Sequence, residues 1–328
     1  MNAPLLSVRD LTIDIQIAQG TLHAVRGIGF DLKRGETLCI VGESGSGKSL
    51  TSLAIMGLLS KKFKRDAARL DFAGIDLMSR KQREMRDLRG NRIAMIFQEP
   101  MTSLNPAYTI GDQLAEAYLL HNKASKAEAR ARAVELLGRV GITAAESRLT
   151  QYPHQLSGGL RQRVMIAMAL MCSPELIIAD EPTTALDVTI QAQILRLLAD
   201  LQREMNMAMI LVTHDLGVVA RIADKVAVMY AGEVVEQGTA REIFEHPRHP
   251  YTRGLLRCIP VPGKTKPGEH LGSIPGIVPS LVGRVEGCAF RDRCDVSEAA
   301  CAAAIPERRL ESGHVWRCVH ASGEGASA

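Results

Sequence analysis

Short apolar runs alternate with longer amphipathic stretches over roughly the first two thirds of the chain. Four of these runs are bounded by polar residues or glycines: 36–41, 92–97, 176–179 and 207–212. Runs such as the last two are typical of strands buried on both faces of a parallel sheet. Helical patterns follow at 49–59 and from about 101 to 172. The pattern therefore predicts an α/β core with a helical insertion.

The ends of two further segments can also be read from the sequence. Ser125 and Glu128 have the spacing of a capping box, which predicts a helix from there to about Gly141. Prolines and glycines are frequent at 247–279, which predicts an irregular extension. We expect one large domain at 1–240, with its helical part at about 100–172, and a C-terminal extension at 241–328.

Composition and charge narrow the class of protein. Hydrophobic residues make up 46% of the chain and charged residues 23%, as in ordinary globular proteins. The net charge of +4 is too small for a nucleic-acid-binding footprint, so we expect no nucleic acid partner. We find no apolar run long enough to span a membrane and no N-terminal targeting pattern. These observations predict a soluble, cytoplasmic protein.

A phosphate-binding loop is the first candidate for chemistry. The segment 42–49 reads GESGSGKS and fits the G-x-x-x-x-G-K-[ST] pattern between a predicted strand and a predicted helix. Its glycines let backbone N–H groups surround a polyphosphate, Lys48 neutralises phosphate oxygens, and Ser49 ligates Mg²⁺. The predicted nucleotide-binding residues here are Gly42, Ser44, Gly45, Ser46, Gly47, Lys48, Ser49 and Leu50.

Polar residues at the ends of the other predicted strands are candidates for hydrolysis. Asp180 and Glu181 end a buried strand, where Asp180 suits Mg²⁺ through water and Glu181 suits polarising an attacking water. His214 ends a further strand and could sense the γ-phosphate. Gln98 follows the strand at 92–97 and could contact Mg²⁺ or the water. The carboxyl ends of parallel strands are where open α/β sheets bind ligands.

A second helix start lacks large side chains. Ser157, Gly158 and Gly159 precede the helix predicted at 161–171, and their amides form a second anion site. One nucleotide needs only one phosphate loop, so we expect a head-to-tail dimer in which each partner's Ser157 loop closes over the other's nucleotide. The alternative is an N-capped helix with two flexible glycines.

Together these motifs resemble the ATP-binding subunit of ABC transporters. The resemblance covers Val8 to about Gly238 and comprises the Walker A loop, Gln98 of the Q-loop, the signature at 156–160, Walker B at 176–180, Glu181, the D-loop at 185–187 and His214. Two positions depart from the family pattern. Leu160 replaces the commoner glutamine of the signature, and no aromatic residue lies near Ile15, where the family usually stacks one on adenine.

Further segments resemble one branch of that family. These are 98–106, 156–163, 180–189, 249–253 and 274–279, and they look like the first ATPase subunit of oligopeptide, dipeptide and nickel importers. The resemblance implies a P-loop NTPase fold with a RecA-like core, an antiparallel β subdomain and an α-helical signature subdomain. It implies ATP and Mg²⁺ as cofactors, and a peripheral location on the cytoplasmic face of the bacterial cell membrane.

The same resemblance implies several partners. They are a second, homologous ATPase subunit, two transmembrane permeases and an extracytoplasmic solute-binding protein. The segment at 101–107 and its neighbouring helices would receive the permease coupling helix. The expected function is ATP hydrolysis that drives uptake of di- or oligopeptides, with nickel or another small solute as the alternative. A soluble, non-transport ABC ATPase is a further alternative, although this chain shows one cassette and no long coiled coil.

Four of the seven cysteines lie near the C-terminus: Cys288, Cys294, Cys301 and Cys318. A C-x2–4-C zinc knuckle is absent. Four thiolates on irregular loops can hold a [4Fe–4S] cluster, and members of this branch carry a C-terminal cysteine motif of this kind. Zinc, with His314 or His320 as a further ligand, and no metal at all remain alternatives. A bound group would act as a staple for the extension or as a redox sensor, and we favour the staple.

Overall fold

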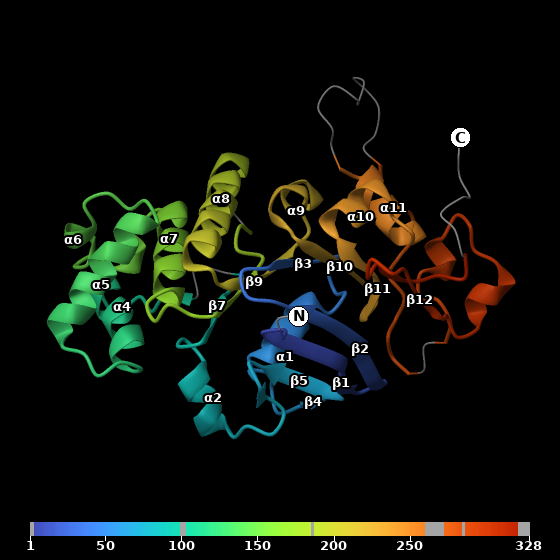
Figure 1. Ribbon diagram of the computed structural model, residues 1–328, viewed down its shortest axis with the longest axis horizontal. Coiled ribbons are helices and arrows are strands. Elements are labelled where there is room, and N and C mark those ends of the chain that lie inside the picture. Colours follow the sequence, from blue (N-terminus) through green and yellow to red (C-terminus); the bar gives the residue numbers. More distant parts are fainter. Residues whose placement is uncertain (1–2, 99–102, 185–186, 260–271, 284–285, 321–328) are drawn as a thin grey trace. The chain divides into compact units, whose positions relative to one another are not determined.

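The computed structural model describes residues 3–98, 103–184, 187–259, 272–283 and 286–320. The chain forms two compact units, one built from Lys33–Glu36 and Ser79–Val212 and the other from Pro4–Leu32, Thr37–Met78 and the chain from Thr213 onward. Figure 1 shows the helices and strands of each unit. Among the helices of the described residues, none combines the length and the apolar character that crossing a membrane requires.

An antiparallel sheet forms one layer of the second unit. Its strands are β1 (Leu6–Ile17), β2 (Gly20–Leu32), β4 (Phe63–Asp66), β5 (Arg69–Phe72) and β6 (Ile75–Asp76), in the order β2-β1-β5-β6 with β4 also paired to β1. In β1, Leu6, Val8, Leu11 and Ile13 are all buried. This apolar face holds the sheet in the core of the unit, because its burial removes large side chains from water.

The second sheet of this unit positions the phosphate loop. Strand β3 (Thr37–Val41) runs parallel to β10 (Lys225–Tyr230), which pairs with β11 (Glu233–Thr239), and β11 pairs with β13 (Val315–Arg317), itself paired with β12 (Glu307–Arg309). The chain passes from β3 into helix α1 (Lys48–Ile55). The other helices of the unit are α9 (Leu216–Ile222), α10 (Ala240–Glu245), α11 (Pro250–Arg257) and the short η2 (Arg291–Arg293) and η3 (Ala299–Ala302).

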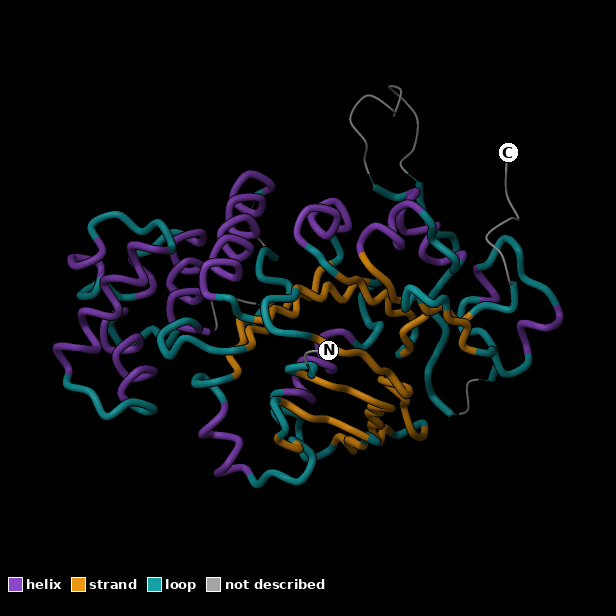
Figure 2. Tube along the Cα trace, in the orientation of Figure 1, coloured by secondary structure: helices purple, strands orange, loops and turns teal. Residues whose placement is uncertain are grey.

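The first unit combines a parallel sheet with a group of helices. Strand β8 (Leu176–Asp180) lies between β7 (Ile93–Ile96) and β9 (Ala208–Thr213), both parallel to it. Among the described residues, its helices include α2 (Gln82–Leu88), α4 (Ile110–Leu119), α5 (Lys126–Arg139), α6 (Ala145–Arg148), η1 (Pro153–Gln155), α7 (Gly158–Ala169) and α8 (Val188–Met205). Figure 2 shows α4 to α7 as a helical group joined to these strands. The predicted parallel strands and helical insertion are confirmed.

Local capping signals behave as the sequence predicted. The Ser125 side chain accepts a hydrogen bond from the Glu128 backbone N–H, and Glu128 in turn accepts one from the Ser125 backbone N–H at 2.7 Å. Helix α5 therefore begins at Lys126, directly after its predicted cap.

The extension is more regular than its prolines predicted. Helix α11 lies inside the segment that we expected to be irregular, and it begins at Pro250. Proline is suited to the first position of a helix because its missing N–H would have no partner there. Strands β12 and β13 also lie in the extension and continue the sheet of β11. The prediction of an irregular segment was therefore wrong for Pro250–Arg257.

Candidate functional site

The loop between β3 and α1 carries the predicted phosphate-binding residues. Gly42 and Gly47 have positive φ angles of 151° and 97°. A side chain on Gly42 would meet the carbonyl oxygen of Met229 at 2.1 Å, and one on Gly47 would meet that of Ala24 at 2.7 Å. Only glycine allows the loop to pass so close to neighbouring backbone. The predicted glycines are therefore required by the geometry of the loop.

Lys48 is held at the start of α1. Its side chain is buried, and Nζ donates to the carbonyl oxygens of Gly42 and Glu43, both at 2.9 Å. Ser46 Oγ is buried and has no hydrogen-bond partner among the described residues. Ser49 is the second residue of the helix. A lysine, hydroxyls and a helix N-terminus in one loop are the donors that a polyphosphate and its Mg²⁺ require.

Glu43 is a member of this loop that the sequence did not single out. Its backbone N–H donates to the hydroxyl of Tyr251 at 2.9 Å. Its carboxylate accepts two hydrogen bonds from the guanidinium of Arg293, at 2.6 and 2.9 Å. Both partners are more than 200 residues away in sequence, so no local pattern could have indicated them.

In the first unit, β8 delivers the predicted carboxylates. Asp180 is its last residue and is buried. Glu181 follows with a φ of 45° and donates its N–H to the carbonyl of Val212 at 2.9 Å. A non-glycine residue in this left-handed region is uncommon and tends to occur at functional sites. The turn places Glu181 directly after the end of the strand.

Gln98 and Glu181 are in contact. Gln98 Nε2 donates to Glu181 Oε2 at 3.1 Å, and Thr184 Oγ1 donates to the same oxygen at 3.1 Å. Two of the three predicted hydrolytic residues are thus brought together within this unit. Thr184 was not predicted. The sequence indicated it only in that it lies in the segment that follows Walker B.

The third hydrolytic candidate, His214, belongs to the other unit. It is exposed and directly follows β9. Asp215 next to it caps α9 by accepting hydrogen bonds from the N–H groups of Gly217 and Val218. Ala185 and Leu186 of the predicted D-loop lie outside the described residues, whereas Asp187 caps α8 through the N–H of Ile190 at 2.9 Å.

The signature residues lie at a helix start, as predicted. Ser157 caps α7 and accepts a hydrogen bond from the N–H of Leu160 at 3.4 Å. Ser157 and Gly158 are exposed, whereas Leu156 before them is buried. Ser157 therefore lies at the surface, and the buried side chain of Leu156 anchors the loop directly before it.

A surface pocket lies beside α4. It is lined by residues that include Ser103, Asn105, Tyr108 and Leu120. Tyr108 is 56% exposed and Leu120 is 74% exposed, so two large side chains with apolar surface lie at this pocket. Met101 and Thr102 of the predicted permease-binding segment lie outside the described residues.

Phe63 lies directly opposite Ile15 in the pairing of β1 with β4. Both side chains are half-buried. An aromatic ring is therefore near the position where the family usually places one, although it comes from a different strand. The sequence could not show this because 48 residues separate the two positions, and only the strand register brings them together.

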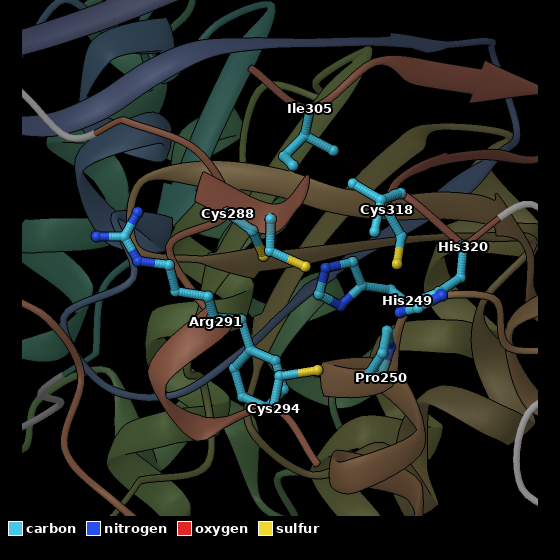
Figure 3. Close-up of a pocket in the computed structure, with 11 residues that line it drawn as sticks. His249, Pro250, Cys288, Arg291, Cys294, Ile305, Cys318 and His320 are labelled. Atoms are coloured by element: carbon cyan, nitrogen blue, oxygen red, sulfur yellow. The ribbon is translucent and has the colours of Figure 1, made fainter. Parts of the chain in front are cut away.

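The four C-terminal cysteines line one pocket, together with His249, Pro250 and Phe290. Figure 3 shows the sulfur atoms of Cys294 and Cys318 directed into this pocket, next to the ring of His249. Cys301 and Cys318 are buried, and Cys288 and Cys294 are half-buried. Spacing alone had not shown that the four thiols converge.

Backbone amides donate to three of these thiols. The donors are the N–H groups of Phe290 to Cys288, Val296 to Cys294, and His320 to Cys318. Burial raises the pKa of all three thiols, that of Cys288 to about 11, and it lowers the pKa of His249 to about 4. Among the described residues, no three His, Cys, Asp or Glu side chains are placed to share one metal ion.

A buried carboxylate fixes one of the segments that line this pocket. Glu236 of β11 is fully buried and accepts hydrogen bonds from the backbone N–H groups of Arg248 at 2.6 Å and His249 at 2.8 Å. The Tyr251 N–H donates to Nδ1 of His249 at 3.1 Å. These bonds fix the segment before α11, and with it one wall of the cysteine pocket.

A glycine-rich loop between a strand and a helix, together with a buried strand that ends in two carboxylates, defines a P-loop nucleotide-binding protein. Comparison with known protein families agrees with this assignment. The ABC transporter family profile matches residues 25–184, and the profile of the oligopeptide/dipeptide transporter C-terminal region matches residues 235–301.

Relatives match almost the whole chain. The dipeptide transport ATP-binding protein of Escherichia coli is 51% identical over 315 residues, which cover 96% of each chain. That of Bacillus subtilis is 51% identical over 316 residues, covering 96% of this chain and 94% of its own. A dimeric ATP-binding cassette bound to ADP and Pi is 29% identical, with a TM-score of 0.64, over 72% of this chain and 99% of its own. The chain belongs to the ABC transporter ATP-binding family, and the predicted fold class is confirmed.

Proposed function

We propose that this protein is the ATP-hydrolysing subunit of an ABC importer that takes up dipeptides or oligopeptides. The observation that carries the proposal is the 51% identity, over nearly the whole chain, to dipeptide transport ATP-binding proteins of two distant bacteria. The match to the oligopeptide/dipeptide transporter C-terminal region supports the same branch of the family. We take 1–240 as the ATPase domain and 241–328 as the extension specific to this branch.

In this function, the residues of the phosphate loop bind the β- and γ-phosphates of ATP. Lys48 neutralises phosphate oxygens, and Ser49, Gln98 and Asp180 hold Mg²⁺ directly or through water. The burial of Lys48 and its position at the start of α1 support its role. Mg²⁺ when bound would neutralise charge on the phosphates.

Glu181 orients and polarises the attacking water. Its side chain accepts hydrogen bonds from Gln98 and Thr184, which support the carboxylate in one orientation. His214, which directly follows β9, contacts the γ-phosphate and in this way senses whether ATP has been hydrolysed. Gln98 follows β7 and leads into the segment before α4, which makes it suited to link hydrolysis to that helical group.

The working assembly in this proposal is a heterodimer with a second, homologous ATPase subunit. Ser157, Gly158 and Gly159 of each subunit bind the phosphates held by the other, because an exposed, capped helix start is an anion site. The dimeric cassette bound to ADP and Pi supports such an arrangement for this fold. An extracytoplasmic binding protein delivers the solute to two permeases.

The pocket beside α4 is the proposed contact with the permeases. Tyr108 and Leu120 are exposed apolar side chains at a concave surface, and such surfaces mark sites of protein interaction. A permease coupling helix would cover them. In this proposal the protein lies on the cytoplasmic face of the membrane and is bound to it only through its partners.

We also propose that the four cysteines hold a [4Fe–4S] cluster that staples the extension. Each cysteine of such a cluster binds a different iron, so the thiols need not share one ion as they would for zinc. The convergence of four thiols and the amide donors to three of them support this donor set. The cluster would cross-link segments that otherwise contribute few apolar side chains.

Uptake by a deletion strain tests the transport function. Deleting the gene should abolish uptake of labelled di- and oligopeptides, and the wild-type gene should restore it, whereas a gene with Lys48→Ala should not. Ni²⁺ uptake measured in the same strains provides the comparison. Loss of Ni²⁺ uptake with normal peptide uptake would overturn the peptide assignment in favour of nickel.

A further inference from the structure

Arg293 connects the cysteine-containing turn to the phosphate loop. It is the last residue of η2 and directly precedes Cys294. Its guanidinium forms a bidentate ion pair with the carboxylate of Glu43, with N–O distances of 2.6 and 2.9 Å. The exposed fraction of the side chain is 4% for Arg293 and 30% for Glu43. Such a planar, bidentate pair fixes both side chains in orientation as well as in distance.

The arginine is fully engaged in this position. Besides its two bonds to Glu43, it donates to the carbonyls of Ile274 at 3.0 Å and Pro275 at 2.8 Å, and to the hydroxyl of Tyr230 at 3.3 Å. These bonds match the five N–H groups of a guanidinium. The hydrogen bonds to Glu43 raise the pKa of Arg293 above its ordinary value. The charge is therefore held in place from several sides.

Glu43 in turn connects three parts of the site. Its carbonyl oxygen accepts a hydrogen bond from Lys48, its backbone N–H donates to Tyr251, and its carboxylate binds Arg293. A free carboxylate in a phosphate loop would repel a polyphosphate, because like charges at close range disfavour each other. Arg293 cancels this negative charge.

Aromatic packing reinforces the same connection. Phe290 contacts the rings of Tyr230 and Tyr251, with ring centroids 5.3 Å apart in each case. The guanidinium of Arg293 lies 5.7 Å from the centre of the Tyr230 ring. Phe290 also donates its N–H to the thiol of Cys288. A rearrangement of the cysteine pocket would therefore displace Arg293 and the residues packed against it.

We propose that Arg293 is a positioning residue that neutralises Glu43 and fixes the phosphate loop, so that the order of the cysteine pocket sets the affinity for ATP. This inference rests on the proposed function, because it assumes that the loop binds ATP. Linkage is reciprocal, so bound ATP also stabilises the ordered pocket.

The first test measures the Kd of Mg-ATP for the full chain by calorimetry. Arg293→Ala should raise the Kd about tenfold, as expected for the loss of a charge-assisted interaction. Arg293→Lys keeps the charge but not the bidentate geometry and should have an intermediate effect. Arg309→Ala is the matched control, since Arg309 is an exposed arginine of the same extension, and its Kd should equal that of wild type.

Charge rescue separates this role from a merely structural one. In the double variant Glu43→Gln, Arg293→Ala, the unpaired carboxylate is gone, so the Kd should return most of the way to the wild-type value. If Arg293→Ala binds ATP as wild type does, or if the double variant binds no better than the single one, the proposal is overturned. The variant Lys48→Ala distinguishes a failure of the proposed function from a failure of the Arg293 proposal. If this variant binds ATP as wild type does, the proposed function is wrong.

The link to the cysteines is tested by Cys294→Ser. Whether this change loosens the pocket or unfolds it, Arg293 is released, and the Kd should rise as it does for Arg293→Ala. The same change should have no further effect in the double variant, in which the connection is already removed. A wild-type Kd for Cys294→Ser, or an equal rise in both backgrounds, would overturn the coupling.

Discussion

His314 Nε2 donates a hydrogen bond to the carboxylate of Glu236 at 2.8 Å, and the side chains of both residues are almost completely buried. The pair joins the segment before β13 to the middle of β11, 78 residues earlier in the chain. Because the same carboxylate also accepts two backbone N–H groups, it organises the start of the extension from a single point.

Replacing this carboxylate should destabilise the extension. Glu236→Ala would leave three donors without their acceptor, two of them buried, and each unpaired buried group costs about 1–3 kcal/mol. We expect a loss of about 3 kcal/mol in the free energy of unfolding of this part of the chain. Trp316 is the only tryptophan and is buried 5.6 Å from the ring of His314, so its fluorescence reports directly on this region.

Urea unfolding followed by Trp316 fluorescence provides the measurement. Glu307→Ala serves as the control, because Glu307 lies in β12 of the same extension but is partly exposed and makes only surface ion pairs. An unfolding midpoint for Glu236→Ala that matches the control would show that the buried carboxylate contributes little.

Changing Glu181 to glutamine should stop turnover without preventing ATP binding. The amide keeps the shape of the side chain but cannot accept a proton from water, so we expect phosphate release to fall at least about 100-fold. The ATP-bound dimer should then accumulate, which gel filtration with the partner subunit would detect. Glu146→Gln, an exposed change in α6, should hydrolyse ATP normally. Retained hydrolysis in Glu181→Gln would refute its assignment as the base.

Removing a cysteine of the pocket should remove the proposed cluster. Anaerobically purified wild-type protein should contain iron and acid-labile sulfide, with visible absorbance, and Cys294→Ser should lose all three because one iron lacks its thiolate. Cys172→Ser, which changes a cysteine outside the pocket, should retain them. Zinc in place of iron in the wild-type protein would favour the zinc alternative. A wild-type protein without any bound metal would contradict both assignments.

A charge on the α4 surface should weaken permease binding. Leu120 is largely exposed, so Leu120→Asp should fold normally but place an unpaired charge in the proposed apolar contact. We expect less permease to co-purify with this variant than with wild type. Ile277→Asp introduces the same charge at a residue that is 90% exposed in the extension and should co-purify normally. Equal recovery from both variants would argue for another contact surface.

The nucleotide-binding elements could be predicted because their signals are local. The strand before Asp180, the glycines of the phosphate loop and the cap at Ser125 each depend on neighbours within a few residues. Buried parallel strands and capping boxes carry such short-range patterns.

The contacts that organise the extension could not be predicted in this way. Arg293 reaches Glu43 across 250 residues, and the pairing of β13 with β11 depends on where the chain returns after a long excursion. Prolines misled the prediction at α11, because the first turn of a helix accommodates the residue that usually breaks one.

The short strands of the extension also protect the sheet from self-association. Without β13, strand β11 would present unpaired backbone N–H and C=O groups along an open edge, which is a template for pairing with another molecule. The outermost strand β12 is only three residues long and consists of Glu307, Arg308 and Arg309. A short, highly charged border of this kind is a common way in which proteins prevent edge-to-edge aggregation. A cassette truncated before the extension should therefore be prone to aggregate, even with its phosphate loop intact.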